Sequence, residues 1–154
     1  MILEKGEMWS AFEDSDLWLF TANAHINKKQ ELTMGKGIAL EVKERFPASV
    51  DVFGSCFYEK DYYLKPYGVY VPKYIPGVDG SSRIGAFQVK YHYRNKASLA
   101  LIGYSVVKLI EMIKERSLMN VHLNWPGIGA GKLKRSEVLP IISELPDVVR
   151  VWGK

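Results

Sequence analysis

Two glycine-rich segments contain the residues best suited to bind an anion. The first, residues 34–38, follows a polar loop and precedes a helical pattern; it consists of Met34, Gly35, Lys36, Gly37 and Ile38. The second, residues 126–131, follows an apolar run; it consists of Pro126, Gly127, Ile128, Gly129, Ala130 and Gly131. Glycine tolerates positive φ and lets a ligand approach the backbone closely. Free amides at the start of a helix, together with the helix dipole, favour a phosphate.

Together, the two segments predict a site that holds a diphosphate from both sides. The first lacks the spacing and the following Ser or Thr of a Walker loop. A tight turn before a helix is the alternative interpretation of this first segment. Three glycines within five positions make a purely mechanical turn a weaker explanation of the second.

The polar loop before the first glycine segment supplies the candidates for acid–base chemistry. Asn23 can only donate and accept hydrogen bonds, so it would orient a ligand or water. His25, two residues later, is the best candidate for a general acid or base, and His92 is the second. A histidine in a surface loop without a catalytic role is the alternative for both.

Three further polar residues have weaker claims to the site. Asn27 can line it or simply stabilise a turn. His122 alternates with Val121 and Leu123 in a strand pattern, which favours a structural histidine. Asn124, at the end of that strand, has a better position from which to reach the ligand.

The composition limits the other possible kinds of site. Three distant histidines and a single cysteine, Cys56, predict neither a metal site nor an internal disulfide, and no cofactor is expected. The net charge of +4 suits an anionic ligand, but also RNA or an acidic partner. Tyrosines interleaved with Lys and Arg can form a platform for single-stranded nucleic acid, or can pack within the fold; these are Tyr62, Tyr63, Tyr67, Tyr70, Tyr74, Tyr91 and Tyr93.

Alternating strand and helix patterns must position these residues. Strands are predicted at 2–5, 17–21, 69–72, 86–91, 119–124 and 148–152. Helices are predicted within 34–47, where Pro47 ends the pattern, and at 48–58, 97–116 and 137–145. A loop rich in glycine and proline, residues 72–85, separates the third and fourth strands.

This alternation predicts parallel βαβ units in an α/β sandwich, with residues 1–154 forming a single domain. Such sheets bind ligands at the carboxyl ends of their strands, where both glycine segments fall. The sequence has no signal-peptide pattern and no apolar run near the roughly 20 residues of a membrane helix. We therefore expect no membrane association and a cytoplasmic protein.

Four segments of the chain resemble macrodomains. They are Gly6-Glu7-Met8, Thr21-Ala22-Asn23, the segment MGKGIALEVKERFP and the later PGIGAG. The similarity is to the branch that holds terminal ADP-ribose glycohydrolases, antitoxins that reverse DNA ADP-ribosylation, and yeast-type ADP-ribose-1″-phosphate phosphatases. It implies a three-layer α/β/α fold around a mixed, roughly six-stranded sheet, with an ADP-ribose cleft across the strand ends.

The resemblance also implies roles for individual residues. Glu7 stands where the family has an aspartate that accepts a hydrogen bond from adenine, and Asn23 corresponds to the asparagine that contacts the distal ribose. The ligand-binding residues expected from the resemblance and the glycine segments are Glu7, Met8, Asn23, Met34, Gly35, Lys36, Gly37, Ile38, Pro126, Gly127, Ile128, Gly129, Ala130 and Gly131.

Lys90 aligns with a lysine that some glycohydrolases of this branch use as a covalent nucleophile. That role requires a deprotonated amine, and so burial or a neighbouring cation. Those enzymes carry an aspartate just after the second glycine segment, where this chain has Leu133. The alternative for Lys90 is a phosphate contact or a solvated surface lysine.

The sequence therefore predicts a protein that binds ADP-ribose and hydrolyses a derivative of it. Asn23, His25 and Lys90 are the catalytic candidates. Because the acidic residue is missing, dephosphorylation of ADP-ribose-1″-phosphate is preferred over removal of ADP-ribosyl groups. A non-catalytic reader of ADP-ribose is the first alternative and a single-stranded nucleic-acid binder the second; a monomer is the default expectation.

Overall fold

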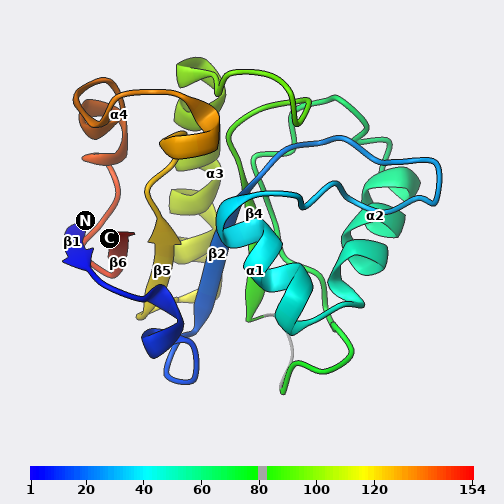
Figure 1. Cartoon of the computed structure of the whole chain (residues 1–154). Helices are drawn as coiled ribbons and strands as arrows, with labels where there is room; N and C mark the ends of the chain where they lie inside the picture. Colours follow the sequence, from blue (N-terminus) through cyan, green and yellow to red (C-terminus); the bar gives the residue numbers. More distant parts are fainter. Residues whose placement is uncertain (80–82) are drawn as a thin grey trace.

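The computed structural model describes residues 1–79 and 83–154 and contains a six-stranded sheet in the order β1-β6-β5-β2-β4-β3 (Figure 1). Adjacent strands pair in parallel, except that β3 and β4 are antiparallel. The sheet is therefore mixed, as predicted. The strands are β1 (Ile2–Lys5), β2 (Leu17–Ala22), β3 (Val69–Tyr70), β4 (Ile84–Gln88), β5 (Val121–Asn124) and β6 (Val149–Gly153).

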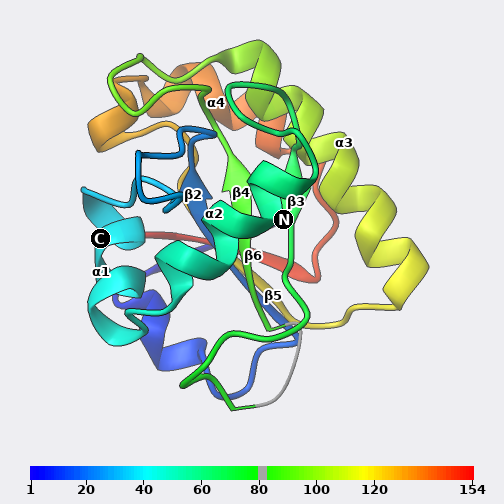
Figure 2. The same cartoon turned by 90° about the vertical axis from the view of Figure 1, so that its right-hand side faces the viewer.

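Helices cover both faces of this sheet (Figures 1 and 2). Residues of α1 and α2 pack in one hydrophobic core, and residues of α3 and α4 pack in the other. This arrangement confirms the predicted three-layer α/β/α fold. The helices are α1 (Gly37–Arg45), α2 (Ser49–Glu59), α3 (Leu99–Arg116) and α4 (Arg135–Ile142), with short 3₁₀ turns η1 (Met8–Ala11) and η2 (Gly129–Gly131).

The central strand β2 contributes to both cores because its side chains alternate between the two faces of the sheet. Leu17 and Leu19 point into the core under α3 and α4, whereas Trp18 and Phe20 point into the core under α1 and α2. All four side chains are buried. A strand covered on both faces is apolar throughout, which is why the run LWLF predicts its position.

Side-chain caps and hydrogen bonds outside the sheet ladder explain where several elements differ from prediction. Helix α3 begins after Ser98, whose hydroxyl accepts from the Leu101 amide at 3.2 Å, and not at 97. Strand β5 is shorter than predicted because the amides of Met119 and Asn120 donate to Asp16 Oδ2 at 2.8 and 3.0 Å. Helix α4 spans Arg135–Ile142 and so begins and ends earlier than the predicted range 137–145. At its start, the Glu137 side chain accepts a hydrogen bond from the Lys134 amide.

Strand β4 was predicted too late in the chain. It ends at Gln88. The Val89 amide still donates to the Ala22 carbonyl of β2 at 2.9 Å, and the hydrogen bonds beyond it go to loops. The Ser98 amide donates to the Val89 carbonyl and the Ala24 amide to the Tyr91 carbonyl, both at 2.9 Å. Lys90 therefore lies beyond the strand, and not at its end. Residues 80–82 of the predicted loop 72–85 lie outside the described residues.

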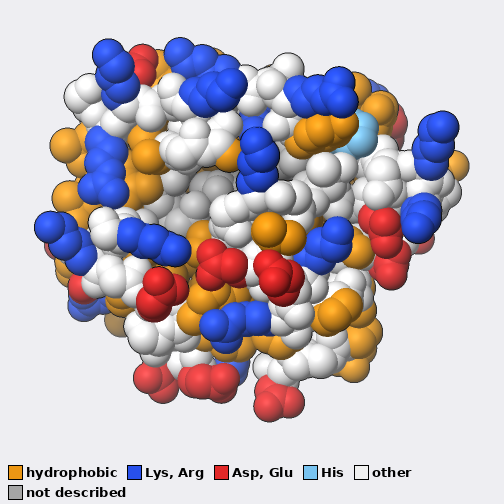
Figure 3. Space-filling model, viewed as in Figure 1, with side chains coloured by type: hydrophobic (Ala, Val, Ile, Leu, Met, Phe, Trp, Pro, Cys, Tyr) orange, Lys and Arg blue, Asp and Glu red, His pale blue; other side chains and the backbone are white. Residues whose placement is uncertain are grey.

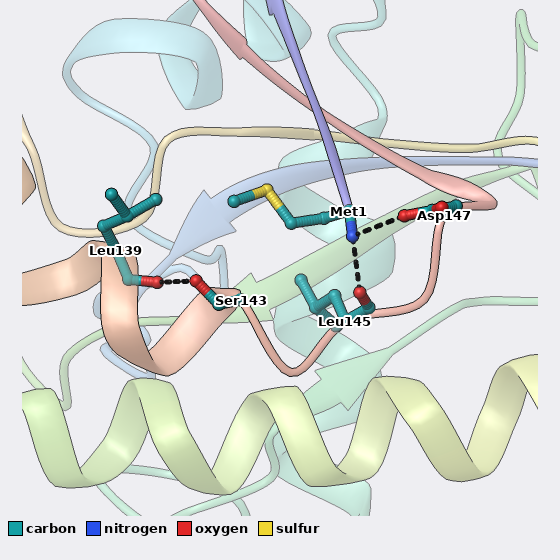
Figure 4. A network of polar contacts seen from close by, with 5 residues as sticks. All are labelled: Met1, Leu139, Ser143, Leu145 and Asp147. Carbon is teal, nitrogen blue, oxygen red and sulfur yellow. Dashed lines mark hydrogen bonds and ion pairs between the residues drawn. The ribbon is translucent and has the colours of Figure 1, made fainter.

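The edge strand β1 is held at its start by the N-terminal ammonium group. The Met1 nitrogen donates to the Leu145 carbonyl at 2.6 Å and to Asp147 Oδ1 at 3.1 Å (Figure 4). These contacts fix the start of β1 to the turn before β6. Within the described residues, the helices are either too short or too polar to cross a lipid bilayer.

Candidate functional site

The first glycine segment lies between β2 and α1 and exposes its backbone. Lys36 is the N-cap of α1 in an extended conformation, and Gly37 has a φ of +58°. A Cβ atom added at Gly35 or Gly37 would meet no atom within 4 Å. The space over these two residues is therefore open to a ligand.

The second glycine segment, between β5 and α4, contains glycines of two kinds. A Cβ atom at Gly127 would lie 2.8 Å from Leu133 Cδ1, and one at Gly131 would lie 2.9 Å from the Cβ of Ala97. These two glycines allow close packing. Gly129, with a φ of +71°, has nothing within 4 Å of its added Cβ, so this part of the loop is open like the first segment.

Both segments line a single cleft of about 1090 Å³. A volume of this size accommodates a dinucleotide-sized ligand. The predicted site residues that line it are Asn23, Gly35, Lys36, Gly37, Ile38, Lys90, Gly127, Ile128, Gly129, Ala130 and Gly131. The convergence expected from the sequence is thus present, and the cleft is not filled by side chains.

The charge around this cleft is strongly positive. Its lining includes six basic side chains and, among the described residues, no Asp or Glu; the basic residues are Lys36, Lys90, Arg94, Lys132, Arg135 and Lys154. In Figure 3, Lys and Arg side chains predominate in the upper half of the face shown, and most Asp and Glu side chains lie lower. Such a lining favours a ligand with several negative charges.

Asn23 lines the cleft and also organises the polar loop around it. Its Oδ1 atom accepts from the His25 amide at 2.8 Å, and its Nδ2 atom donates to the Thr33 carbonyl at 3.0 Å. The Tyr67 hydroxyl donates to the Asn23 carbonyl from the buried side at 2.8 Å. These three hydrogen bonds therefore fix the side chain and the backbone of Asn23 before a ligand binds.

Lys90 reaches the cleft from the loop after β4. Its Nζ atom donates to the Tyr93 carbonyl at 3.0 Å. Burial lowers the pKa of this amine below the usual value, and the neighbouring Lys36 and Lys132 ammonium groups lower it further. Burial and neighbouring cations, each of which favours the neutral amine, are thus both present at this position.

His25 lies behind the wall of the cleft and does not line it. Its Nδ1 atom is 2.7 Å from the hydroxyl of Thr33, which does line the cleft. Its ring packs against His92 and Tyr93 with centroids 4.6 and 4.8 Å away. Burial, and secondarily His92, lower the pKa of His25 below its usual value, which favours the neutral imidazole.

Comparisons with known proteins agree with this geometry. No protein-family model matches the chain. Over 123 residues, the chain is 33% identical to proteins named DNA ADP-ribosyl glycohydrolase from Mycobacterium bovis and Mycobacterium tuberculosis; the match covers 75% of this chain and 33% of each relative. The chain thus spans about a third of the length of these curated relatives.

Solved structures extend the similarity to the whole chain. The macrodomain of Mycobacterium tuberculosis DarG has a TM-score of 0.73 and 26% identity, covering 99% of this chain and 97% of that one. The chain has the macrodomain fold. The macrodomain of Thermus aquaticus DarG, at 22% identity, has the same fold with a TM-score of 0.75 and covers 98% of this chain and 95% of that one.

Four predicted ligand-binding residues of this macrodomain do not line the cleft. The side chains of Met8, Met34 and Pro126 are buried; the carbonyl of Met8 accepts a hydrogen bond from the Trp18 indole. Glu7 is exposed, and its Oε1 atom lies 3.8 Å from the Nζ atom of Lys154, which lines the cleft. Met8, Met34 and Pro126 are thus part of the interior of the fold, and Glu7 lies next to a lining residue.

The other polar candidates are mostly structural. Asn27 stabilises a turn by accepting from the amides of Lys29 and Glu31. Leu133 is buried beneath Gly127, so the position after the second segment offers no carboxylate. Asn124 does line the cleft, where it exchanges hydrogen bonds with Thr21. Among the described residues, no group of three or more His, Cys, Asp and Glu side chains is placed to hold a metal ion.

One end of the macrodomain cleft is lined by residues that the sequence alone did not single out. Trp125 and Trp152 line it from the ends of β5 and β6, and the Arg135 guanidinium lies 4.9 Å from the Trp125 ring centroid. Thr33 was missed as well. These residues come from distant segments and carry no shared motif; the one sequence signal was that Trp125 follows a predicted strand and that Trp152 is the last residue of another.

Proposed function

We propose that this macrodomain binds ADP-ribose, with the diphosphate between the two glycine segments. The convergence of both segments on one cleft carries this proposal, because open backbone at Gly35, Gly37 and Gly129 suits close approach by phosphate oxygens. The six basic lining residues supply the opposite charge. Thermosipho africanus DarTG, which has the same fold with a TM-score of 0.71, was solved in complex with ADP-ribose.

The reaction we infer is removal of an ADP-ribosyl group from a macromolecule, with DNA as the preferred carrier. The curated relatives bear the name DNA ADP-ribosyl glycohydrolase. Dephosphorylation of ADP-ribose-1″-phosphate, which the sequence alone favoured, finds no support in those relatives. The basic lining also suits a nucleic-acid carrier, whose phosphates add negative charge beyond the diphosphate.

Lys90 is the nucleophile in this proposal. Its free amine attacks C1″ of the distal ribose; the bond from C1″ to the carrier breaks, and the electron pair leaves with the carrier. The nitrogen gives up a proton, which the carrier takes. Water then cleaves the C1″–N bond, so that ADP-ribose leaves and the amine is restored. The lowered pKa of Lys90 and its place in the cleft support this role.

One observation favours a second function, the recognition of ADP-ribose without catalysis. The described lining holds no Asp or Glu, and Leu133 occupies the position of the expected acid. A cleft without a carboxylate has fewer means of moving protons. The second function predicts tight binding with no turnover.

The test is release of ADP-ribose from a single-stranded oligonucleotide that carries one ADP-ribosylated base. We expect release by the wild type and a loss of about a hundredfold or more in Lys90→Ala. Lys90→Arg keeps a positive charge at this position. It should therefore retain most of the ADP-ribose affinity, measured by calorimetry, but should lose the activity. Lys114→Ala, on an exposed position of α3, is the matched control and should retain full activity. Binding without release by the wild type would support the reader function instead.

The pH profile of release tests Lys90 further. The rate should rise with pH until the Lys90 amine is deprotonated, since only the neutral amine is nucleophilic. Replacing Lys132 by Met removes a cation that disfavours the charged form of Lys90. The rise should then move to higher pH. A profile unchanged by Lys132→Met would contradict the nucleophile assignment.

A further inference from the structure

Trp152 forms part of the cleft wall and is held by a residue that does not line the cleft. The indole Nε1 atom donates to His122 Nδ1 at 2.9 Å. Strand register pairs Asn124 with Trp152 and His122 with Arg150, so His122 lies two residues nearer the start of the strands. His122 is 3% exposed. The imidazole therefore supports the indole from inside the sheet layer.

This hydrogen bond fixes the tautomer of His122. An indole N–H can only donate, so Nδ1 must be the acceptor. The proton of the neutral ring is then on Nε2, which is buried and has no hydrogen-bond partner among the described residues. A protonated ring would carry N–H groups on both nitrogens and would turn one of them toward the indole N–H. The contact therefore exists only with a neutral imidazole.

Burial, more than the surrounding charges, favours the neutral imidazole. Burial lowers the pKa of His122 below its usual value of 6.5, Arg150 on β6 lowers it further, and Glu4 on β1 opposes them. Glu4 is itself paired with Arg150. The other elements against His122, β2 and η1, consist of uncharged residues. The protonated state is thus reached only below the pH at which an ordinary histidine titrates.

We infer that His122 is a positioning residue that holds Trp152 in the cleft wall, and that its protonation frees the indole and weakens nucleotide binding. An indole ring offers a nucleobase a flat apolar surface only while its orientation is fixed. The ligand in this inference is the ADP-ribose of the proposed function. The coupling between the two side chains does not depend on that ligand.

The coupling is tested first without ligand. Proton–nitrogen NMR resolves the four indole N–H signals, and Trp152→Phe identifies the one from Trp152. We expect this signal to shift, and to exchange faster with solvent, as the pH falls from 7.5 to 5. His122→Asn, whose side-chain oxygen can accept in place of Nδ1 but cannot be protonated, should abolish the change. The inference would be overturned if the Trp152 signal did not change with pH, or if it changed with pH in His122→Asn as it does in the wild type.

ADP-ribose affinity is then measured by calorimetry over the same pH range. Wild-type affinity should fall as the pH drops below 6.5, whereas His122→Asn should keep its affinity. His122→Leu removes the acceptor and should bind about threefold to tenfold more weakly at pH 7.5, the effect of one lost hydrogen bond. A pH dependence that survives in His122→Asn would point to a titrating group other than His122 and contradict the inference. If ADP-ribose bound at no pH, the proposed function would fail, while the indole titration would still decide the role of His122.

Discussion

At the scale of single residues, the glycines of the cleft act in two ways. Gly127 and Gly131 have neighbours that leave no room for a methyl group, whereas Gly35, Gly37 and Gly129 face open space. The first kind permits the loop to pack against α3 and Leu133. The second kind permits a ligand to reach the backbone. Substitution at the two kinds of position should therefore affect different properties of the protein.

We expect Gly127→Ala to lower the free energy of unfolding by about 1–3 kcal/mol, because its methyl group would overlap Leu133 and its φ of +76° strains an L-residue. Gly35→Ala should change stability little but should weaken ADP-ribose binding, because the methyl group lies on the ligand side. Urea denaturation and calorimetry of both variants measure the two effects. Equal loss of stability in both would contradict this division.

Some of these residue positions could be predicted from the sequence and others could not. The glycine segments and Asn23 are local patterns next to predicted strands, so their place at the strand ends follows from topology. Lys90 reached the predicted site although its strand ends at Gln88. Trp125 and Trp152 were missed because strand pairing, rather than any short motif, brings them to the cleft.

At the scale of elements, α3 connects the cleft to the core. Its cap, Ser98, accepts from the Leu101 amide, and the Ser98 amide donates to the Val89 carbonyl beside Lys90. Its other end is closed by Ser117 in a left-handed conformation, with a φ of +51°. The apolar stripe predicts this helix well, while the cap, rather than the stripe, determines where it begins.

Substitutions at the two ends of α3 should have opposite effects on stability. Ser98→Ala removes the cap and should cost about 1 kcal/mol. Ser117→Gly relieves the left-handed backbone and should stabilise the protein by up to about 1 kcal/mol. Thermal denaturation of the two variants against the wild type measures both. A destabilised Ser117→Gly variant would show that the Ser117 side chain makes a contact worth more than the relieved strain.

At the scale of the whole molecule, charge is distributed unevenly. The net charge is +4, but six basic side chains gather around the cleft without an acidic neighbour in its described lining. The ion pairs of the described chain lie mostly elsewhere, as for Lys65 with Asp61 and Lys108 with Glu111. The cleft therefore carries more positive charge than a single diphosphate would neutralise.

An oligonucleotide carrying ADP-ribose should therefore bind with a steeper salt dependence than free ADP-ribose. Each additional phosphate contact adds about 0.7 to the slope of the logarithm of affinity against the logarithm of salt concentration. The comparison is made by measuring the affinity of each ligand at salt concentrations between about 50 and 200 mM. Identical slopes for the two ligands would mean that only the ADP-ribosyl group is recognised.

The distribution of the four tryptophans gives this macrodomain a natural optical reporter. Trp125 and Trp152 line the cleft, whereas Trp9 of η1 and Trp18 of β2 pack against each other with ring centroids 4.1 Å apart. A nucleotide entering the cleft would quench the emission of the first pair and leave that of the second as a constant background. Ligand occupancy can thus be followed by intrinsic fluorescence, without a dye or a tag.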